Sequence, residues 1–516
     1  MESTPPIAQP QTPTTTGDST VAVVPEPKEA GAPRVSEQTD GHVFEVLRHT
    51  HFRTMWFAAF GSYVGNWFEF VAIGWLLSQE TKSEDWMALR ATAQLCPTLL
   101  LGMLAGLIAD SVNRRTLLIV TQFGMMVIAL AMAGAVFAGW ANRWVLVGLS
   151  LAQGVAVAFN MPAWQVLTPR LVPRNELTQA ITLSGISFNI ARVVGPALAG
   201  GIMRAFQGAA PAAVTAAVVL TAEGALPRMG STRGAAALLL FNALTFVVVM
   251  LAVLTTPDAP APAEMRGAWR HPAVIWTRSR EAIRWVWTHK GPRAVFLAIV
   301  VFAMFATPLM QLMPLLVSEV YHSKEDSYGI LLATMGVGAV MGGLGMKLVP
   351  RWYPMHHFIP VAITLGGVFI LLLSLAETVP WAMFQMFFVG IFWMWGFNST
   401  AAAMQNLVDD QMRGRVSAVV NTIAMGLMPL GTYVASRAGH AGDAVLRRAA
   451  PGIVDSGTGT QVGLATTSIV LIGAGAVMLI WRTPEVDGLR PGDAGYDRRP
   501  GLWRGITAGA HRPRGG

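Results

Sequence analysis

The chain has 516 residues, of which 53% are hydrophobic and 13% are charged, and its mean hydropathy is +0.48. Soluble globular domains carry about 25% charged residues, so these values exclude an ordinary soluble domain and predict an integral membrane protein. A formal charge of +8 would suggest nucleic-acid binding in a soluble protein. Here the Lys and Arg residues fall mainly between apolar segments, where they set membrane orientation, so we expect no nucleic-acid partner.

The N-terminal segment differs in composition from the rest of the chain. Residues 1–41 are rich in Pro, Thr, Ala and Glu and hold no apolar stretch of the kind that a cleavable signal peptide requires. Because such a composition does not form a packed core, we expect a disordered tail over residues 1–50. Residues 484–516 have the same character and are expected to form a second disordered tail.

Twelve apolar segments lie between these tails, and each has the roughly 20 residues that cross a hydrocarbon core of ~30 Å. We place them at 53–78, 87–109, 116–139, 143–167, 178–206, 234–256, 294–320, 327–349, 356–376, 380–405, 414–438 and 462–482. The Ala-rich piece 209–223 is assigned to an external loop, with a short re-entrant or interfacial helix as the alternative. The predicted fold is therefore all-α, with one six-helix bundle over 51–256 and another over 294–483.

Basic residues indicate the orientation of these spans. The loops after even-numbered spans carry basic pairs, and the linker 257–293 between the bundles carries seven Lys and Arg residues. The positive-inside rule places these loops, the linker and both termini in the cytoplasm, which predicts a multi-pass protein of the cell (inner) membrane. Within the linker, residues 274–290 carry Trp on one side and Arg on another, which is typical of an amphipathic helix on the membrane surface.

The two bundles contain an internal repeat. A shift of 236 residues takes Gly106 to Gly342 and Gly195 to Gly431, together with their surrounding glycine spacing. Two equal halves with the same loop pattern predict a pseudo-twofold axis along the membrane normal. Transporters built from such repeats bind their substrates near the interface of the halves.

The stretch GLIADSVNRR joins the second span to the third. Gly102 and Gly106 form a small-residue face that lets another helix approach closely. Asp110 can accept hydrogen bonds from the N-terminus of a neighbouring helix, and Arg114 and Arg115 can bind carboxylates or lipid phosphates. The spacing alone also fits an alternative without a functional role, in which this stretch is a simple turn with basic anchors.

This stretch resembles the cytoplasmic-loop signature of the major facilitator superfamily, G-x-L-a-D-r-x-x-r-R, although Ser111 stands where an arginine is usual. The stretches FRTMWFAAFGSYVGNWFEFVAIGWLL, NIARVVGPALAGG and MRGRVSAVVNTIAMGLMPLG resemble the branch that contains the enterobactin exporter and macrolide efflux proteins. The resemblance covers about residues 50–482 and includes no match to a single substrate.

The resemblance implies a secondary active transporter that works by alternating access, with a central cavity lined by spans one, four, seven and ten. It also implies that the loop signature latches the two halves together on the cytoplasmic side. By position, Asp110 would face the start of span eleven near Arg413 and Gly414, while Met346 replaces the acid in the second copy. The implied gate residues are Gly106, Asp110, Arg114, Arg115, Arg413, Gly414 and Arg415.

Glu69 and Arg192 lie inside predicted spans, where charges are costly and indicate function by default. They stand about 17 and 14 residues into spans one and five, which gives them similar depths at 1.5 Å per residue. Because the implied fold makes these spans neighbours, a Glu69–Arg192 pair is expected. It can be a static ion pair, or a proton-exchanging carboxylate whose affinity Arg192 sets, and the remaining alternative is that the two do not meet. Asp110 is the second candidate for proton coupling.

The implied cavity would be aromatic and polar but almost uncharged. Its predicted lining is Tyr63, Asn66, Trp67, Phe70, Gln153, Asn160, Trp164, Met310, Gln311, Gln385, Trp393, Trp395 and Asn398. Met and aromatic faces adapt to varied shapes, so such a surface suits a large amphipathic solute. Packing against other helices or lipid is the alternative for about half of these residues, because Trp is also common at membrane interfaces.

Together these features predict a proton-coupled exporter of a siderophore or of an amphipathic drug-like molecule, with the preference for export resting on the family branch. The alternatives are an importer, or a non-transporting sensor or scaffold that uses the same fold. The sequence holds no G-x-x-x-x-G-K-[ST] motif and no metal-ligand spacing, so we expect no cofactor, no metal and no enzyme activity. Cys96 is the single cysteine, which excludes a disulfide framework within the chain. Separately, the protein is expected to be a monomer.

Overall fold

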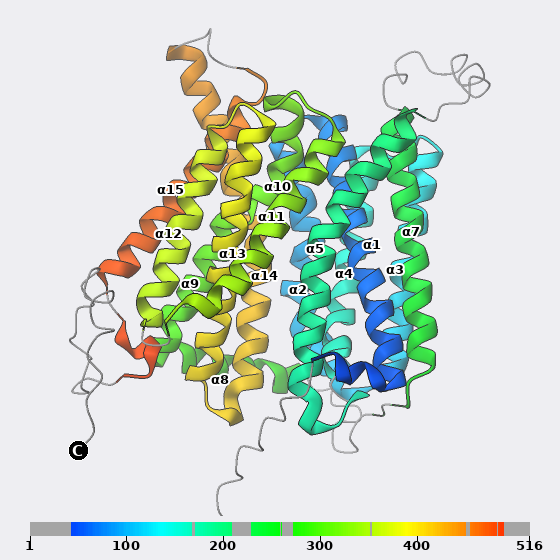
Figure 1. Ribbon diagram of the computed structural model, residues 1–516, viewed down its shortest axis with the longest axis vertical. Helices are drawn as coiled ribbons and strands as arrows, with labels where there is room; N and C mark the ends of the chain where they lie inside the picture. The colour runs from blue at the N-terminus through cyan, green and yellow to red at the C-terminus, as the bar shows by residue number, and fades with distance from the viewer. Residues whose placement is uncertain are drawn as a thin grey trace, which may run out of the picture. The chain divides into compact units, whose positions relative to one another are not determined.

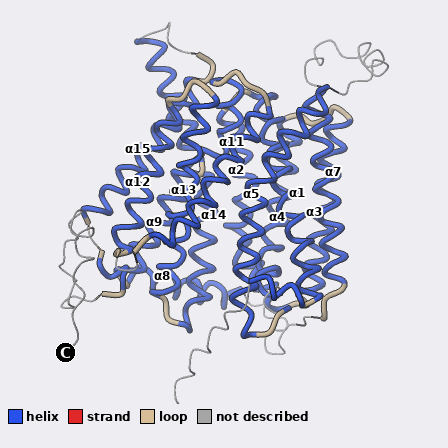
Figure 2. Tube along the Cα trace, in the orientation of Figure 1, coloured by secondary structure: helices blue, strands red, loops and turns tan. Residues whose placement is uncertain are grey.

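Helices make up the regular structure of the described chain. The computed structural model describes residues 43–167, 171–208, 229–258, 260, 272–350, 353–449, 455–481 and 483–489, and no strand occurs among them. Figure 1 shows how the helices are arranged, and Figure 2 shows the loops that join them. In chain order the elements are η1 (Val43–Arg48), α1 (Thr50–Thr81), α2 (Glu84–Ser111), α3 (Arg114–Phe137), α4 (Arg143–Leu167), η3 (Arg174–Glu176), α5 (Leu177–Gly208), α7 (Met229–Leu254), α8 (Pro272–Thr288), α9 (Lys290–Ala306), α10 (Pro308–Leu315), η7 (Leu316–Val320), α11 (Glu325–Gly345), η8 (Met346–Leu348), α12 (Met355–Ser374), α13 (Val379–Leu407), α14 (Asp410–Ala449), α15 (Thr458–Ile480) and η9 (Pro484–Asp487).

The predicted membrane-spanning, all-helical fold is confirmed. Eleven described spans are long and apolar enough to cross a membrane, and α9, α10 and η7 together form one of them. The remaining predicted span, the first at 53–78, corresponds to α1. Its 32 residues extend ~48 Å at 1.5 Å per residue, but polar and aromatic residues such as Asn66, Trp67 and Glu69 lower its hydropathy. The piece 209–223 lies outside the described residues.

The two bundles have equivalent helix neighbours. In the N-terminal half (α1 to α7), α2 packs against α4 and α3 packs against α7; in the C-terminal half (α9 to α15), the equivalent pairs are α11 with α13 and α12 with α15. Across the boundary between the halves, α2 packs against α14 and α11 packs against α5. The 236-residue shift exchanges these two contacts, which is the symmetry that the internal repeat predicts.

The seventh span is the least regular. α9 ends at Ala306, and Pro308 begins α10 after a single residue, Thr307. Pro314 near the end of α10 is followed by a π-helical turn, η7. Proline removes a backbone donor and clashes with the preceding turn, so both prolines interrupt the helical hydrogen bonds. Broken spans near the boundary of two repeats are a common feature of transporter folds.

The helices have two ends that we name by the elements lying there. The linker end carries η1, α8 and η9, and the opposite end is called the closed end (Figure 1). The linker helix α8 occupies most of the predicted amphipathic segment 274–290. Parts of both predicted disordered tails are helical instead, because η1 packs against α5 and η9 packs against α9 and α12.

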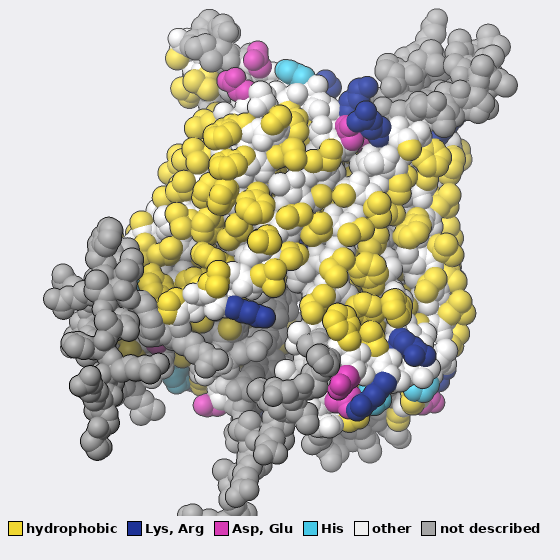
Figure 3. Space-filling view, viewed as in Figure 1, with side chains coloured by type: hydrophobic (Ala, Val, Ile, Leu, Met, Phe, Trp, Pro, Cys, Tyr) yellow, Lys and Arg dark blue, Asp and Glu magenta, His cyan; other side chains and the backbone are white. Residues whose placement is uncertain are grey.

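Hydrophobic side chains cover the middle of the face seen in Figure 3, while most Lys, Arg, Asp and Glu side chains on that face lie towards its two ends. Exposed large apolar residues occur on α3, α5, α7 and α13, as expected for helices that face lipid rather than water. One predicted boundary is wrong: the span predicted to end at 438 continues as α14 to Ala449. Its last turns carry Asp443 and Arg447, which form an ion pair at i and i+4 and stabilise helix beyond the apolar segment.

Candidate functional site

Glu69 lies in a polar network inside the N-terminal half. Its side chain is buried, and Oε2 accepts hydrogen bonds from Asn242 Nδ2 at 2.7 Å and from Gln153 Nε2 at 3.3 Å. These donors come from α7 and α4, so the carboxylate joins three helices. Gly65, one turn earlier on α1, allows the close approach of Asn242, since a Cβ there would clash with it.

The cation near Glu69 is Arg90 of α2. Arg90 is buried and interacts electrostatically with Glu69 and with the Tyr328 hydroxyl. Its guanidinium also lies 5.2 Å from the Phe70 ring centre and donates to the Phe70 carbonyl at 3.4 Å. Tyr328 belongs to α11, so this network reaches the C-terminal half. Gly74 makes room for it, because an added Cβ would lie 3.2 Å from Tyr328 Oη and 3.4 Å from Arg90 Nη1.

Arg192 does not pair with Glu69 in this structure, so the expected Glu69–Arg192 contact is not formed. Instead its guanidinium lies 5.4 Å from the centre of the Trp393 ring, on α13 of the other half. Arg90 was not predicted as the partner because the predicted second span begins only three residues before it, where a long side chain is expected to reach the membrane surface. Asn242 was not predicted because it lies on α7, the sixth span, outside the spans that the family resemblance places around the cavity.

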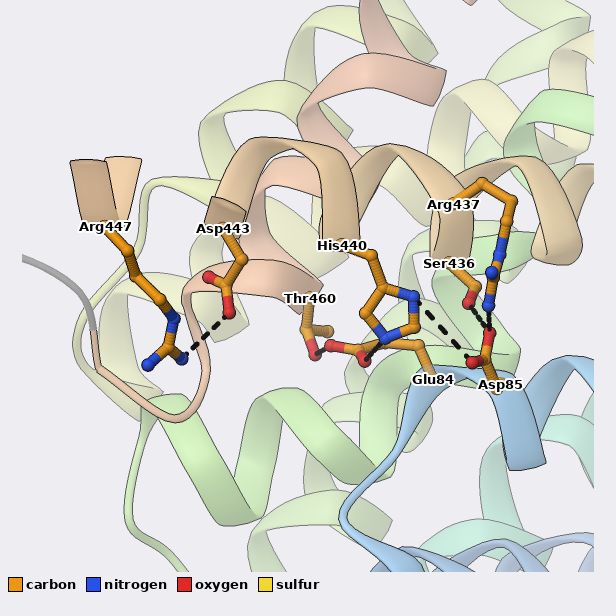
Figure 4. Close-up of polar contacts among 8 residues, drawn as sticks. All are labelled: Glu84, Asp85, Ser436, Arg437, His440, Asp443, Arg447 and Thr460. Carbon is orange, nitrogen blue, oxygen red and sulfur yellow. Dashed lines mark hydrogen bonds and ion pairs between the residues drawn. The ribbon is translucent and has the colours of Figure 1, made fainter. Parts of the chain in front are cut away.

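A polar cluster joins the halves at the closed end (Figure 4). Glu84 Oε1 accepts a hydrogen bond of 2.7 Å from Thr460, and Asp85 accepts from both Ser436 and Arg437. His440 Nε2 lies 3.8 Å from Glu84 Oε2, and His440 Nδ1 lies 3.8 Å from Asp85 Oδ2. We call Glu84, Asp85, Ser436, Arg437, His440 and Thr460 the α2–α14 seam.

The equivalent boundary between α5 and α11 is also held at the closed end. Arg204 near the end of α5 pairs with Asp326 in the first turn of α11. A second pair also crosses between the halves at this end: Lys82, which follows α1, lies 3.2 Å from Glu319 of η7. Just inside these pairs the helices touch through glycine, since an added Cβ on Gly329 would meet the backbone of α5. Both boundaries between the halves are therefore closed at this end.

At the linker end, the ion pairs of the described residues stay within one half or involve the linker. Asp110, at the end of α2, lies 3.5 Å from Arg114, the first residue of α3. Asn113 caps α3, because its side chain accepts a hydrogen bond of 3.0 Å from the Arg115 backbone N–H. Arg115 pairs with Asp258 at 3.1 Å, which ties the start of α3 to the chain after α7.

Among the gate residues whose side chains the structure describes, no ion pair bridges the two halves. A Cβ added to Gly106 would meet nothing within 4 Å, so the close helix contact expected at this glycine is absent, whereas Gly102 faces Thr422 of α14. Arg415 lies 3.5 Å from Glu281 of α8. Arg413 and Gly414 fall in the first turns of α14, but the surroundings of these two residues lie outside the described part of the structure.

η1 is anchored to the start of α5 through Glu176. His49 Nε2 lies 2.8 Å from Glu176 Oε2, and Arg48 pairs with the other carboxylate oxygen. The hydrogen bond with His49, followed by the charge of Arg48, lowers the pKa of Glu176 below its usual value of 4.5. This contact lies wholly within the N-terminal half.

The predicted cavity residues divide into two groups. The first group makes contacts that do not cross between the halves. In the N-terminal half, Gln153 donates to Glu69, Asn160 donates to Thr121 at 2.9 Å, and Tyr63 pairs with Trp164. In the C-terminal half, Trp395 donates to the Gly342 carbonyl at 2.8 Å. Tyr63 and Trp164 line a small pocket on α1, α4 and α5 together with Phe52, Met55, Trp56, Ala59, Ser184 and Ser187.

Two of the remaining residues have a side-chain oxygen that accepts no hydrogen bond from the described residues. Gln311 and Gln385 are buried, and the side-chain oxygen of each has no hydrogen-bond partner among the described residues. Asn66 is exposed, and Trp67, Phe70, Met310, Trp393 and Asn398 are partly exposed. A buried amide without a partner is costly, so these oxygens are available to a ligand or to water. No group of three or more His, Cys, Asp and Glu residues that could hold a metal occurs in the described chain.

Two kinds of curated relative match most of the chain. The staphyloferrin A transporter of Staphylococcus aureus is 22% identical over 73% of this chain and 87% of its own length. The multidrug efflux pump Tap of Mycolicibacterium fortuitum is also 22% identical, over 73% of this chain and 87% of its own length.

Solved structures show the same fold. A bacterial homologue of the lysosomal transporter Spinster, inward-facing and unoccupied, matches with a TM-score of 0.63 at 14% identity over 83% of this chain and 96% of that chain. A POT family transporter matches with a TM-score of 0.60 at 10% identity over 84% of this chain and 96% of that chain.

A profile of the transmembrane secretion effector family matches residues 42–229 and 228–489, which together cover both halves. The family and the relatives are transporters rather than enzymes. The chain therefore belongs to the transmembrane secretion effector family of the major facilitator superfamily.

Proposed function

We propose that this transporter exports a siderophore or an amphipathic drug-like molecule by alternating access, and that protons drive it. The observation that carries the proposal is the uneven distribution of contacts between the halves. At the closed end, the α2–α14 seam and the Arg204–Asp326 pair cross the boundary. Among the described residues at the linker end, Asp110 and Arg115 pair within their own half. Closure at one end only is expected of one state of a two-state transporter.

The basic linker supports the orientation. With the linker end in the cytoplasm by the positive-inside rule, both termini are cytoplasmic and this conformation is open to the cytoplasm. The membrane is the cell (inner) membrane, and one chain is the working unit. An exporter collects its cargo from the cytoplasm in this state and releases it after the seam opens.

The cargo class is supported by the relatives and by the character of the predicted cavity residues. The staphyloferrin A transporter and the multidrug efflux pump Tap both cover most of this chain. The aromatic and amide side chains of Trp67, Trp393, Gln311 and Gln385 offer both apolar surface and hydrogen bonds, as sites for amphipathic molecules do.

Glu69 is proposed as the proton carrier. Its direct partners are the neutral amides of Asn242 and Gln153, so the carboxylate can gain a proton without breaking a direct ion pair. Arg90 is the nearby cation that favours the charged form. Arg90 also interacts with Tyr328 of the other half. A change of charge on Glu69 therefore alters the electrostatic interactions at the boundary that must open.

Comparing a deletion strain with its parent tests the proposal. The siderophores and other metabolites of the medium and of the cells are measured by mass spectrometry, with the wild-type gene and a Glu69→Gln gene returned on plasmids. Export predicts a compound that falls in the medium, accumulates in the cells and is restored only by the wild-type gene. A compound that instead accumulates in the medium indicates an importer, and identical metabolite profiles indicate a non-transporting protein.

A further inference from the structure

Arg192 is a charged residue in the middle of α5 with no acidic partner among the described residues. Its guanidinium lies against the ring of Trp393 instead. Arg90, the buried arginine near the start of α2, has Glu69 as a nearby counter-charge. The two charges of that network offset each other, so Arg192 is left as an excess positive charge inside the helical bundle.

The position of Arg192 is at the boundary of the halves rather than on the lipid face. Neighbouring backbone of α5 packs against α11, since a Cβ on Gly336 would meet Val193 and the Arg192 carbonyl. One turn later, Gly195 packs against Trp67 of α1. Arg192 itself keeps partial solvent exposure, and its guanidinium points to α13, which belongs to the other half.

Trp393 is held in place from its own half. Its ring meets Phe302 of α9 edge-on, with ring centres 5.0 Å apart. A tryptophan face attracts a guanidinium but does not neutralise its charge, and charges inside a membrane protein are normally paired. The Arg192–Trp393 contact therefore leaves the guanidinium donors free, among the described residues, to bind an anion beside an aromatic ring.

We infer that Arg192 and Trp393 form the binding site for an aromatic carboxylate or a similar anionic aromatic group of the cargo. A guanidinium binds a carboxylate through two parallel hydrogen bonds, and an indole ring packs on an aromatic ring at its edge or face. This inference rests on the proposed function and deepens it, because it names the charge and ring character of the cargo. It also places the two contacts on opposite halves, so that bound cargo bridges α5 and α13.

Binding of a matched pair of probes tests the inference. Naphthalene-2-carboxylate and its neutral amide, naphthalene-2-carboxamide, have the same ring system and differ in charge. Equilibrium dialysis with the purified full chain in detergent at pH 7.5 is expected to give at least about tenfold tighter binding of the carboxylate. In Arg192→Gln the two affinities become equal, and in Arg192→Lys part of the preference remains, because a lysine keeps the charge but not the paired donors.

Two variants serve as controls. Arg204→Gln removes another arginine of α5, one that already pairs with Asp326, and is expected to keep the wild-type preference. Trp393→Leu weakens both probes while preserving the preference for the carboxylate. Size-exclusion profiles identify any variant that fails to fold. If Arg192→Gln fails, the probe affinities of Arg192→Lys are compared with those of the wild type instead.

Three outcomes would overturn the inference: equal binding of both probes by the wild type, no binding of either, or a carboxylate preference that survives Arg192→Gln. Displacement of the carboxylate by phosphatidylglycerol but not by phosphatidylcholine would also overturn it, because a lipid headgroup would then be the anion at Arg192. The binding assay does not depend on transport. A failure of export with an intact preference rejects the proposed function alone, and the reverse result rejects this inference alone.

Discussion

Asn242 of α7 donates a hydrogen bond of 2.7 Å to Glu69 of α1, deep in the N-terminal half. The carboxylate is thus held by a neutral donor and compensated at longer range by Arg90. A group placed in this way can change its charge while its hydrogen-bond geometry is retained, which is what proton coupling requires.

Glu69→Gln is expected to abolish proton-coupled transport and leave the protein folded, because the amide keeps the size of the side chain and can still accept from Asn242. The measurement is dissipation of a preformed pH gradient in inside-out vesicles when cargo is added. Glu281→Gln, on the exposed linker helix, is the control and should behave as the wild type. Normal coupling in Glu69→Gln would remove Glu69 from the mechanism.

Arg90→Met is expected to destabilise the protein, because it leaves the Glu69 carboxylate buried without its compensating cation. Removing one partner of a buried charge pair costs about 3 kcal/mol. The double variant Glu69→Gln/Arg90→Met should recover part of this loss, since no net charge is then stranded. Thermal unfolding of all four proteins in one detergent gives the coupling between the sites. Additive losses would show that Arg90 and Glu69 act independently.

Asp85→Asn is expected to weaken the α2–α14 seam, because Asp85 accepts from Ser436 and Arg437. Arg437 is exposed and Asp85 is half exposed, so solvent screens the pair and the loss of stability is expected to be small. Hydrogen–deuterium exchange should rise in peptides covering 82–88 and 433–442. Asp443→Asn is the matched control, since Asp443 pairs with Arg447 inside α14. Equal effects of the two variants would contradict a gating role for the seam.

Asp110→Asn is expected to slow transport without weakening cargo binding. In this state Asp110 contacts only Arg114 among the described side chains, so its proposed role belongs to the other state, in which the linker end is closed. Transport rate and cargo affinity are measured on the same preparation. Asp258→Asn, which removes the partner of Arg115 within the same half, is the control. A loss confined to affinity would reject the latch.

Glu176 predicts a pH dependence of stability. Its lowered pKa means that the folded state favours the carboxylate, so the stabilisation is present above the usual, unfolded-state pKa of 4.5 and is lost as pH falls through the lower folded value. The difference in Tm between the wild type and Glu176→Gln should therefore be present at pH 7 and close below about pH 4. A difference that grows with acidity would contradict the Glu176–His49 contact.

Much of the fold could be predicted from the sequence because hydrocarbon imposes length and polarity on each span. Eleven spans of the described chain meet those criteria, and the glycine repeat predicted the symmetry of the two halves. The 236-residue shift also accounts for the exchange of the α2–α14 and α5–α11 contacts. The two breaks in the seventh span were not predicted, although Pro308 and Pro314 are the residues that signal them.

The site was harder to predict than the fold. Glu69 was recognised because a carboxylate inside a span has few structural explanations, but its partners depend on helix rotation, which apolar composition does not determine. For this reason Arg90, not the predicted Arg192, is the cation near Glu69, and Arg192 lies against Trp393. The α2–α14 seam was missed because its members lie at span ends, where polar residues are ordinary. Their role in joining the halves is apparent only from their contacts across the boundary.

The proposed mechanism depends most on the two ends of the molecule opening in turn. Spin labels at Asn175 and Gln405 report the linker end, and labels at Ala138 and Glu377 report the closed end, both in a Cys96→Ser background. Double electron–electron resonance distances are compared between the wild type and Glu69→Gln. Alternating access predicts that any condition that shortens the linker-end distance lengthens the closed-end distance. Distances that change in the same direction at both ends, or that do not change at either, would contradict it.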